Sequence, residues 1–109
     1  MRSIVQGVKK ETIVRSNAIT QSANGEACTI CDTNDGTTVF CHLNESYAGK
    51  SMGRKASDIA GFFGCSACHR EYDHPTKGRY HLNWEITRAM YRTWVRLIEL
   101  GVITVKGAK

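Results

Sequence analysis

Two Cys-x-x-Cys pairs are the sequence feature that most constrains how this chain can fold. Cys28 and Cys31 form the first pair, Cys65 and Cys68 form the second, and residues 32–64 lie between them. Each pair can form a knuckle that presents two thiolates, and two knuckles supply the four ligands of a tetrahedral zinc ion. This spacing favours structural zinc over an iron–sulfur cluster or a redox pair. We therefore expect these four cysteines to hold one structural Zn²⁺.

The length of the chain limits the core that it can bury. With 109 residues, the chain has room for one domain with a modest core. A metal that joins two distant knuckles adds folding free energy, so the metal-free protein should fold poorly. No apolar run approaches the ~18 residues that a membrane span needs, and residues 1–10 lack the apolar segment of a secretory signal. Reduced cysteines and a cytoplasmic location are therefore expected.

The first half of the sequence predicts an arm followed by a hairpin. Residues 1–27 contain no cysteine or histidine and are rich in polar residues. We expect a loosely packed N-terminal arm, with at most an edge strand at residues 12–14. A turn signal at residues 35–36 precedes a β-branched and aromatic run over residues 37–43. Residues 59–63 are expected to return as the second strand of a hairpin with a long loop.

The second half predicts two helices. A short helix is expected at residues 69–74, because a proline follows it. The longest helix is predicted over residues 84–100, with Asn83 as its N-cap and Gly101 as its stop. An apolar stripe on this helix should pack on the hairpin. The stripe consists of Ile86, Met90, Trp94 or Val95, Leu97 and Ile98. A short closing strand is expected at residues 102–105.

The charge of the chain favours a polyanionic partner. Lysine and arginine number 15 against 10 aspartates and glutamates, which favours nucleic acid. One basic group lies in a loop at residues 44–57 and consists of Lys50, Arg54 and Lys55. A second group recurs every four residues on the last predicted helix and consists of Arg88, Arg92 and Arg96. Taken alone, the second row is better explained as a solvated helix face.

The order of knuckle, hairpin, second knuckle and helix is typical of a treble-clef zinc finger, an α+β fold, here with an added C-terminal helix. One-metal nucleases of the ββα-metal, or HNH, class use the same arrangement. In these enzymes a strand histidine acts as general base, and a divalent cation neutralises charge on the phosphate. His42 lies on the first predicted strand, while His69 and Asp73 share one face of the helix after the second knuckle. His69 and Asp73 suit Mg²⁺, Mn²⁺ or a second zinc.

From residue 28 through the last helix, the chain resembles the YbcO family of small phage and prophage nucleases. The resemblance rests on three motifs, of which the third is the most specific. They are Thr38-x-x-x-His42-Leu43, Gly53-x-Lys55-x-x-Asp58 and Cys65-Ser66-Ala67-Cys68-His69-x-x-x-Asp73. The resemblance implies a metal-dependent DNA endonuclease of phage recombination or DNA metabolism in a bacterial host cell. It also implies a zinc-stabilised, HNH-like domain over residues 28–109.

The resemblance assigns a role to individual residues. By position, His42 would be the general base, and His69 and Asp73 would bind the catalytic cation. Asp58 would be an auxiliary ligand or an orienting group. The DNA backbone would be held by Lys50, Arg54 and Lys55, and by Arg88, Arg92 and Arg96. A phage recombination protein would be a further partner.

The sequence departs from the wider HNH pattern and leaves an alternative open. Cys41 stands before the strand histidine, where many HNH nucleases have a carboxylate or a histidine. The usual asparagine before the second knuckle is missing, so Asp58 or Asn44 would have to replace it. The alternative function is a non-catalytic zinc module that binds DNA or a recombination partner. A nuclease requires His42 and His69 to face one solvent-exposed cleft, whereas a binding module does not.

Overall fold

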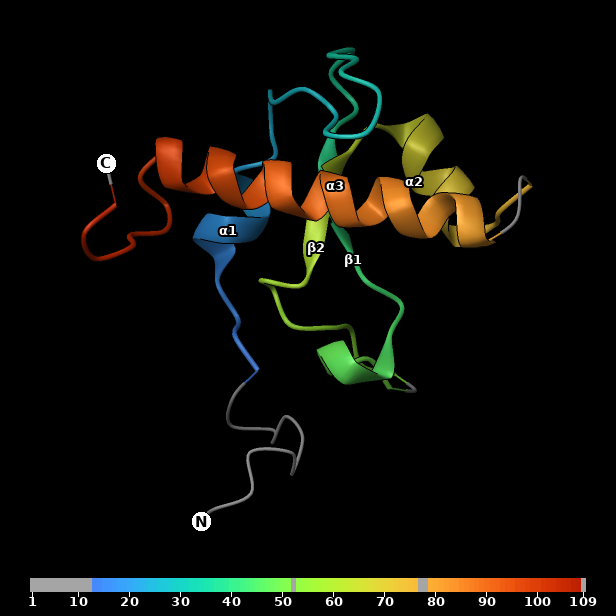
Figure 1. The fold of residues 1–109 in the computed structure, drawn as a ribbon, viewed down its shortest axis with the longest axis horizontal. Coiled ribbons are helices and arrows are strands. Elements are labelled where there is room, and N and C mark those ends of the chain that lie inside the picture. The colour runs from blue at the N-terminus through green and yellow to red at the C-terminus, as the bar shows by residue number, and fades with distance from the viewer. Residues whose placement is uncertain (1–12, 52, 77–78, 109) are drawn as a thin grey trace.

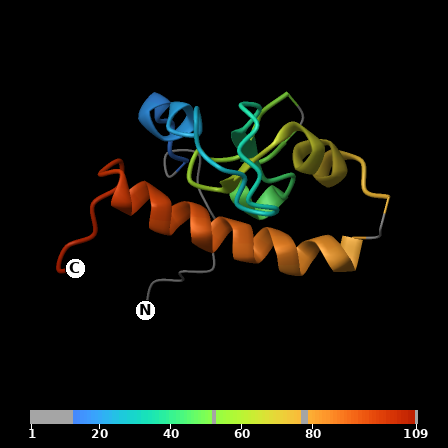
Figure 2. The same ribbon diagram turned by 90° about the horizontal axis from the view of Figure 1, so that it is seen from above.

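The fold is a small α+β domain built around a two-stranded hairpin (Figure 1). A computed structural model describes residues 13–51, 53–76 and 79–108. In chain order the elements are helix α1 (Asn17–Gln21), strand β1 (Val39–His42), the 3₁₀ turn η2 (Ser46–Ala48), strand β2 (Gly61–Gly64), helix α2 (Ser66–Asp73) and helix α3 (Arg79–Glu99). Figure 2 shows α3 along one side of the molecule, with the hairpin, α1 and α2 on the other side of it.

The predicted hairpin is confirmed, although its strands are shorter than expected. β1 and β2 pair antiparallel, with Phe40 opposite Phe63 and Cys41 opposite Phe62. Because side chains alternate along a strand, the two pairs lie on opposite faces of the hairpin. Phe40 and Phe63 belong to one buried cluster, and Cys41 and Phe62 belong to another. The hairpin therefore has core on both faces, which explains why both strands of such a small protein are almost wholly apolar.

α3 starts one turn earlier than predicted. It begins at Arg79, so the predicted start at residue 84 is wrong, and Asn83 lies inside the helix instead of capping it. The carbonyl of Asn83 accepts a hydrogen bond from the hydroxyl of Thr87, at 2.9 Å. No glycine or proline interrupts residues 79–83, so nothing local stops the helix from continuing through them.

The predicted stop of α3 at Gly101 agrees with the structure. Gly101 has a φ of 76°, and its amide donates to the carbonyl of Ile98 at 3.0 Å. The amide of Val102 donates to the carbonyl of Leu97 at 2.9 Å, which completes a Schellman motif. The expected strand at residues 102–105 is absent, because residues 102 and 103 bend back and bond to the carbonyl of Leu97 and residues 104 and 105 have no regular structure.

The inner face of α3 packs on both core clusters. Ile86 and Leu97 are buried, as the predicted stripe requires. Thr93, which the stripe did not include, is also fully buried, and its hydroxyl accepts a hydrogen bond from the amide of Phe63 at 3.0 Å. Trp94, Val95 and Ile98 stay partly exposed. Within the ranges given above, no helix is both long and apolar enough to cross a membrane.

The segment expected to be a loose arm packs into the core where the structure describes it. Ile19 of α1 and Ala23 after it are buried in the cluster of Phe40 and Phe63. Residue 12 of the expected edge strand lies outside the described residues. Residues 13 and 14 form no strand, although the carbonyl of Val14 accepts a backbone hydrogen bond at 2.8 Å. The division into an arm at 1–27 and a domain at 28–109 stays a prediction.

We predict that Gly61→Ala destabilises the hairpin by about 1–3 kcal/mol. Gly61 pairs with His42, and a Cβ at position 61 would lie 2.6 Å from the ring of Phe40 and close to the carbonyl of Cys41. Urea unfolding of the zinc-saturated protein measures the change. Gly36→Ala is the matched control, since a Cβ there meets no atom within 4 Å and only the φ of 84° costs energy. Equal losses in both variants would contradict the packing argument.

Candidate functional site

The four cysteines of the two predicted knuckles come together in the structure. Their Sγ atoms all lie within 4.8 Å of one another, and those of Cys31 and Cys65 are 3.7 Å apart. A tetrahedron of thiolates at the zinc–sulfur bond length has edges of about 3.8 Å. Among the described residues, this is the one group of three or more His, Cys, Asp or Glu side chains with ligand atoms close enough to hold a metal. The cluster has the geometry of a four-thiolate zinc site.

Backbone hydrogen bonds shape each knuckle. In the first, the amide of Cys28 donates to the carbonyl of Thr33 at 2.8 Å, and that of Asp32 donates to the carbonyl of Cys28 at 2.9 Å. This tight turn places Asp32 at a φ of 66°. In the second knuckle, Cys65 is the N-cap of α2, so Cys68 lies in the first turn of the helix. The positive end of the helix dipole favours thiolates there.

Burial and hydrogen bonding act differently on individual thiols. A hydrogen bond with Thr33 lowers the pKa of the exposed Cys31 to about 7. Burial raises the pKa of Cys65 and of Cys68. Without a cation these two residues would therefore keep their protons. A bound metal would stabilise their thiolates, so its binding would release protons.

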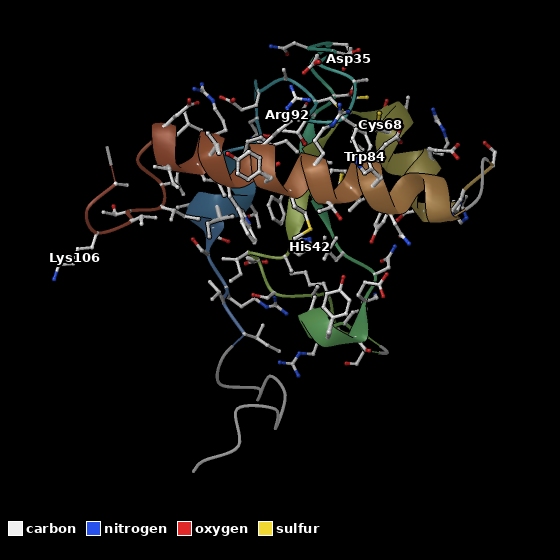
Figure 3. All side chains as sticks on the ribbon, in the orientation of Figure 1. Asp35, His42, Cys68, Trp84, Arg92 and Lys106 are labelled. Carbon is white, nitrogen blue, oxygen red and sulfur yellow. The ribbon has the colours of Figure 1, made fainter. Side chains whose placement is uncertain are left out.

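The arginine row of α3 holds the first knuckle. Arg92 donates to the carbonyl of Thr29 at 2.9 Å and forms an ion pair with Asp32. Arg88 donates to the carbonyl of Ile30 at 3.0 Å. Figure 3 shows Arg92 pointing from α3 toward the knuckle segment. These two arginines therefore fix the turn between Cys28 and Cys31 against α3, and their predicted contact with DNA stays untested.

Arg96 continues the row toward the N-terminal segment. Its Nε lies 2.6 Å from the carboxylate of Glu26, and this ion pair raises the pKa of the guanidinium. The guanidinium of Arg88 also lies over the ring of Trp84, 5.0 Å from its centre. All three arginines thus have partners within the chain, which a solvated helix face would not require.

His42 is paired with Asp58. Its Nε2 lies 2.7 Å from Oδ1 of Asp58, and the two side chains are 18% and 5% exposed. Oδ2 of Asp58 accepts a hydrogen bond from the amide of Ser16 at 2.7 Å. Burial would raise the pKa of Asp58, but hydrogen bonds from His42 and Ser16 lower it overall. Asp58 therefore accepts a hydrogen bond from the imidazole of His42, and its predicted role as an auxiliary ligand or an orienting group stays a prediction.

His42 shares its face of the hairpin with Phe40. The two rings meet edge to face at 5.0 Å, and Phe40 packs in the same way on Phe63. α2 packs on the opposite face, where Tyr72 meets Phe62 edge to face at 5.5 Å. His42 and α2 therefore lie on different faces of the hairpin.

His69 and Asp73 form a second pair on α2. Nε2 of His69 lies 3.3 Å from Oδ2 of Asp73, and both side chains are about 40% exposed (40% and 41%). The side-chain amide of Asn44 donates to Oδ1 of Asp73 at 3.3 Å. Asn44 thus joins this pair, one of two residues that we expected to replace the missing asparagine. In the described part of the chain, no interaction links this group to His42 or Asp58.

The basic loop lies where the sequence predicted it. Ser51 and Arg54 form an isolated bridge at its tip. Lys50 and Lys55 are exposed and Arg54 is half-buried. For these three basic side chains, the described residues provide no ion pair. They are therefore available to solvent, and their predicted contact with DNA phosphates is not tested.

Three contacts that organise these groups were not predicted from the sequence. Thr93 anchors α3 to β2, Ser16 holds Asp58, and Tyr72 accepts a hydrogen bond from the amide of Asn44 at 2.8 Å. A polar residue within an apolar helix stripe was the available signal for Thr93. Nothing in the sequence pairs Ser16 with Asp58, because 42 positions separate them.

One comparison with known proteins identifies a family, and another finds a solved structure of similar fold. A family model described as "Putative nuclease YbcO" matches residues 15–102. No curated protein matches the chain. A solved structure from Escherichia coli strain K-12 substrain MG1655, described as a "putative bacteriophage protein", is 27% identical with a TM-score of 0.56. The match covers 75% of this chain and 98% of that one. The predicted resemblance is confirmed and reaches upstream of the first knuckle.

We predict that Cys68→Ala abolishes zinc binding and much of the helical circular dichroism, because the metal is needed to join the two knuckles. Cys41→Ala is the matched control, since Cys41 is a buried cysteine outside the cluster. It should keep one zinc per chain. Metal analysis of the purified variants measures the stoichiometry. One zinc per chain in Cys68→Ala would contradict the assignment.

Proposed function

This chain belongs to the family described as "Putative nuclease YbcO", and on that premise we propose that it is a metal-dependent DNA endonuclease. Its reaction would be hydrolysis of a DNA phosphodiester bond in phage recombination or DNA metabolism, inside a bacterial cell. A zinc-stabilised treble clef of the HNH type would be the scaffold. The family match supports the class of enzyme, and the pairing of His42 with Asp58 supports the assignment of its base. Against it stands the placement of His42 and α2 on different faces of the hairpin, because a nuclease requires His42 and His69 to face one cleft.

The His42–Asp58 pair suits a general base. An ionised carboxylate can only accept, so Nε2 of His42 carries the proton at the 2.7 Å contact. The lone pair of the neutral imidazole is then at Nδ1, which makes no hydrogen bond among the described residues. Nδ1 would take the proton from the attacking water, and Asp58 would stabilise the imidazolium that results.

His69, Asp73 and Asn44 suit a hard divalent cation. They offer an imidazole nitrogen, a carboxylate and an amide oxygen from the end of β1 and from α2. Mg²⁺ and Mn²⁺ accept few protein ligands and keep several waters, so a small, exposed donor set is sufficient. When bound, such a cation would neutralise negative charge on the scissile phosphate. The three side chains themselves would fix the position of that cation.

Lys50, Arg54 and Lys55 would bind the DNA backbone through its phosphates. Such contacts fix the position of the DNA without reading its sequence. Arg88, Arg92 and Arg96 are less suited to this role, because each already binds a group of the segment at residues 26–32. We therefore assign phosphate binding to the basic loop in preference to the three arginines of α3.

One observation favours a second candidate function, a zinc module that binds DNA or a recombination protein without cleaving it. His42 lies on the face of Phe40, while α2 packs on the face of Phe62. A one-metal nuclease needs its base and its cation at one phosphate. In a binding module, His42 and Asp58 would instead tie the N-terminal segment to the hairpin through Ser16.

We predict that His42→Ala lowers DNA cleavage in Mg²⁺ or Mn²⁺ by about 10²–10⁴-fold, the usual contribution of a general base. Asp58→Asn should cause a smaller loss, because the amide can still hold the imidazole but cannot stabilise its charge. Plasmid and oligonucleotide cleavage measure the rates. His74→Ala is the control, since His74 is an exposed histidine at the end of α2. Full activity of His42→Ala, with cleavage by the parent chain, would rule out this base.

A separate prediction concerns the cation. His69→Ala and Asp73→Asn should raise the Mn²⁺ concentration needed for half-maximal cleavage at least tenfold and leave the bound zinc unchanged. Titration of Mn²⁺ at fixed DNA concentration measures the shift. If neither the parent chain nor any variant cleaves DNA, although the parent binds it, the binding module is the correct function.

A further inference from the structure

Two adjoining cavities form a groove between α3 and the segment that follows β1. One cavity has a volume of about 230 Å³ and the other of about 310 Å³. Leu43, Tyr47 and Met90 line both, so the cavities adjoin each other along α3. We call this feature the α3 groove. The His42–Asp58 pair and the cysteine cluster do not line it, so its chemistry is separate from theirs.

Aromatic rings line the α3 groove along its length. Tyr47 is 70% exposed and lies where the two cavities meet. At one end, Trp94 is fixed by a hydrogen bond from its indole N–H to the carbonyl of Ile59 at 3.0 Å. At the other end is Tyr72, whose ring packs on Phe62. Rings held in place in this way can stack on planar groups at little entropic cost.

Positive charge lies beside the groove. The amide of Ser57 donates to the carbonyl of Ala48 at 2.8 Å, and both residues line the smaller cavity. The loop that they close carries Lys50, Arg54 and Lys55. No lysine or arginine is among the described residues that line the two cavities. A polyanion would therefore run along the basic loop and place its uncharged groups in the groove.

Asn44 connects the groove to the candidate cation site. Its amide N–H donates to the hydroxyl of Tyr72, which lines the groove, and its side chain donates to Asp73. The Tyr72 end of the groove is thus two hydrogen bonds away from the carboxylate of Asp73. The backbone of a DNA strand bound in the groove would therefore pass close to His69 and Asp73.

Together, stacking rings and a flanking basic loop match the chemistry of unpaired nucleotides. A duplex keeps its bases stacked on one another and gives such rings nothing to bind. We propose that the α3 groove binds unpaired bases, so that the substrate is single-stranded DNA or a DNA with single-stranded segments. This inference rests on the proposed nuclease function and adds the form of DNA that it acts on.

Binding of a fluorescent oligothymidylate and of a duplex of equal length tests the inference, with zinc-loaded protein and no added Mg²⁺ or Mn²⁺. Tyr47→Ala should weaken binding of the single strand by roughly tenfold and leave duplex binding unchanged. Tyr47→Phe keeps the ring and should keep the affinity. Tyr91→Ala is the matched control, because Tyr91 is 67% exposed and lines a different cavity. It should bind as the parent chain does.

A second measurement leaves the groove unaltered. Trp84 and Trp94 are the two tryptophans of the chain, so Trp84→Phe makes Trp94 the single indole fluorophore. Stacking of thymine on Trp94 should quench its emission as the oligothymidylate is added. Binding without quenching would overturn the inference.

Other outcomes separate the alternatives. Equal affinity for single strand and duplex, or equal loss in Tyr47→Ala and Tyr91→Ala, would overturn the groove assignment. If no DNA binds and the chain self-associates in sedimentation until Tyr47 is replaced, the groove binds a second copy instead. Cleavage of duplex DNA without binding of a single strand would refute the proposed role of the groove and leave the nuclease function standing. Binding of a single strand without cleavage of any DNA would refute the nuclease function and leave the proposed role of the groove standing.

Discussion

The backbone of Phe63 joins the three parts of this fold. Its carbonyl accepts from both the amide and the hydroxyl of Thr29 in the first knuckle, each at 2.8 Å. Its amide donates to Thr93 of α3. Two strands of four residues would be marginal alone, and these bonds cover the free edge of β2. Since Cys65 follows two residues later, one bound metal would hold the edge strand, the knuckle and the long helix together.

The elements that local chemistry defines could be predicted from the sequence. Metal-ligand spacing located both knuckles, β-branched and aromatic residues located β1, and Gly101 located the end of α3. The start of α3 could not be predicted in this way, because Asn83 is a preferred N-cap residue that the helix nevertheless continues through. The packing of α1 was missed for another reason. Ile19 of α1 and Ala23 after it are the buried side chains of this segment, and they are too few to stand out among polar residues.

The arrangement of the candidate site could be predicted from the sequence only in part. Alternation along β1 predicts that His42 shares a face with Phe40, and it does. Which face α2 covers depends on the contact of Tyr72 with Phe62, and no periodicity encodes that contact. Motif spacing therefore predicts which residue types could form a site, whereas the separation of the two histidines required the three-dimensional arrangement. Asn44 was named as one of two candidates to replace the missing asparagine, and its hydrogen bond to Asp73 places it beside the predicted cation ligands without testing that role.

The hydrogen bond between Asp58 and the amide of Ser16 has a consequence for how the molecule can be divided. A chain shortened to begin at the first knuckle would retain every cysteine, both strands, α2 and α3. It would lose Ser16 and also Arg15, whose guanidinium reaches the carbonyls of Lys55 and Ala56 beside Asp58. Asp58 would then bond only to the imidazole of His42, and the basic loop would be freed at its base. The smallest piece that keeps the metal is thus shorter than the smallest piece that keeps the histidine in place.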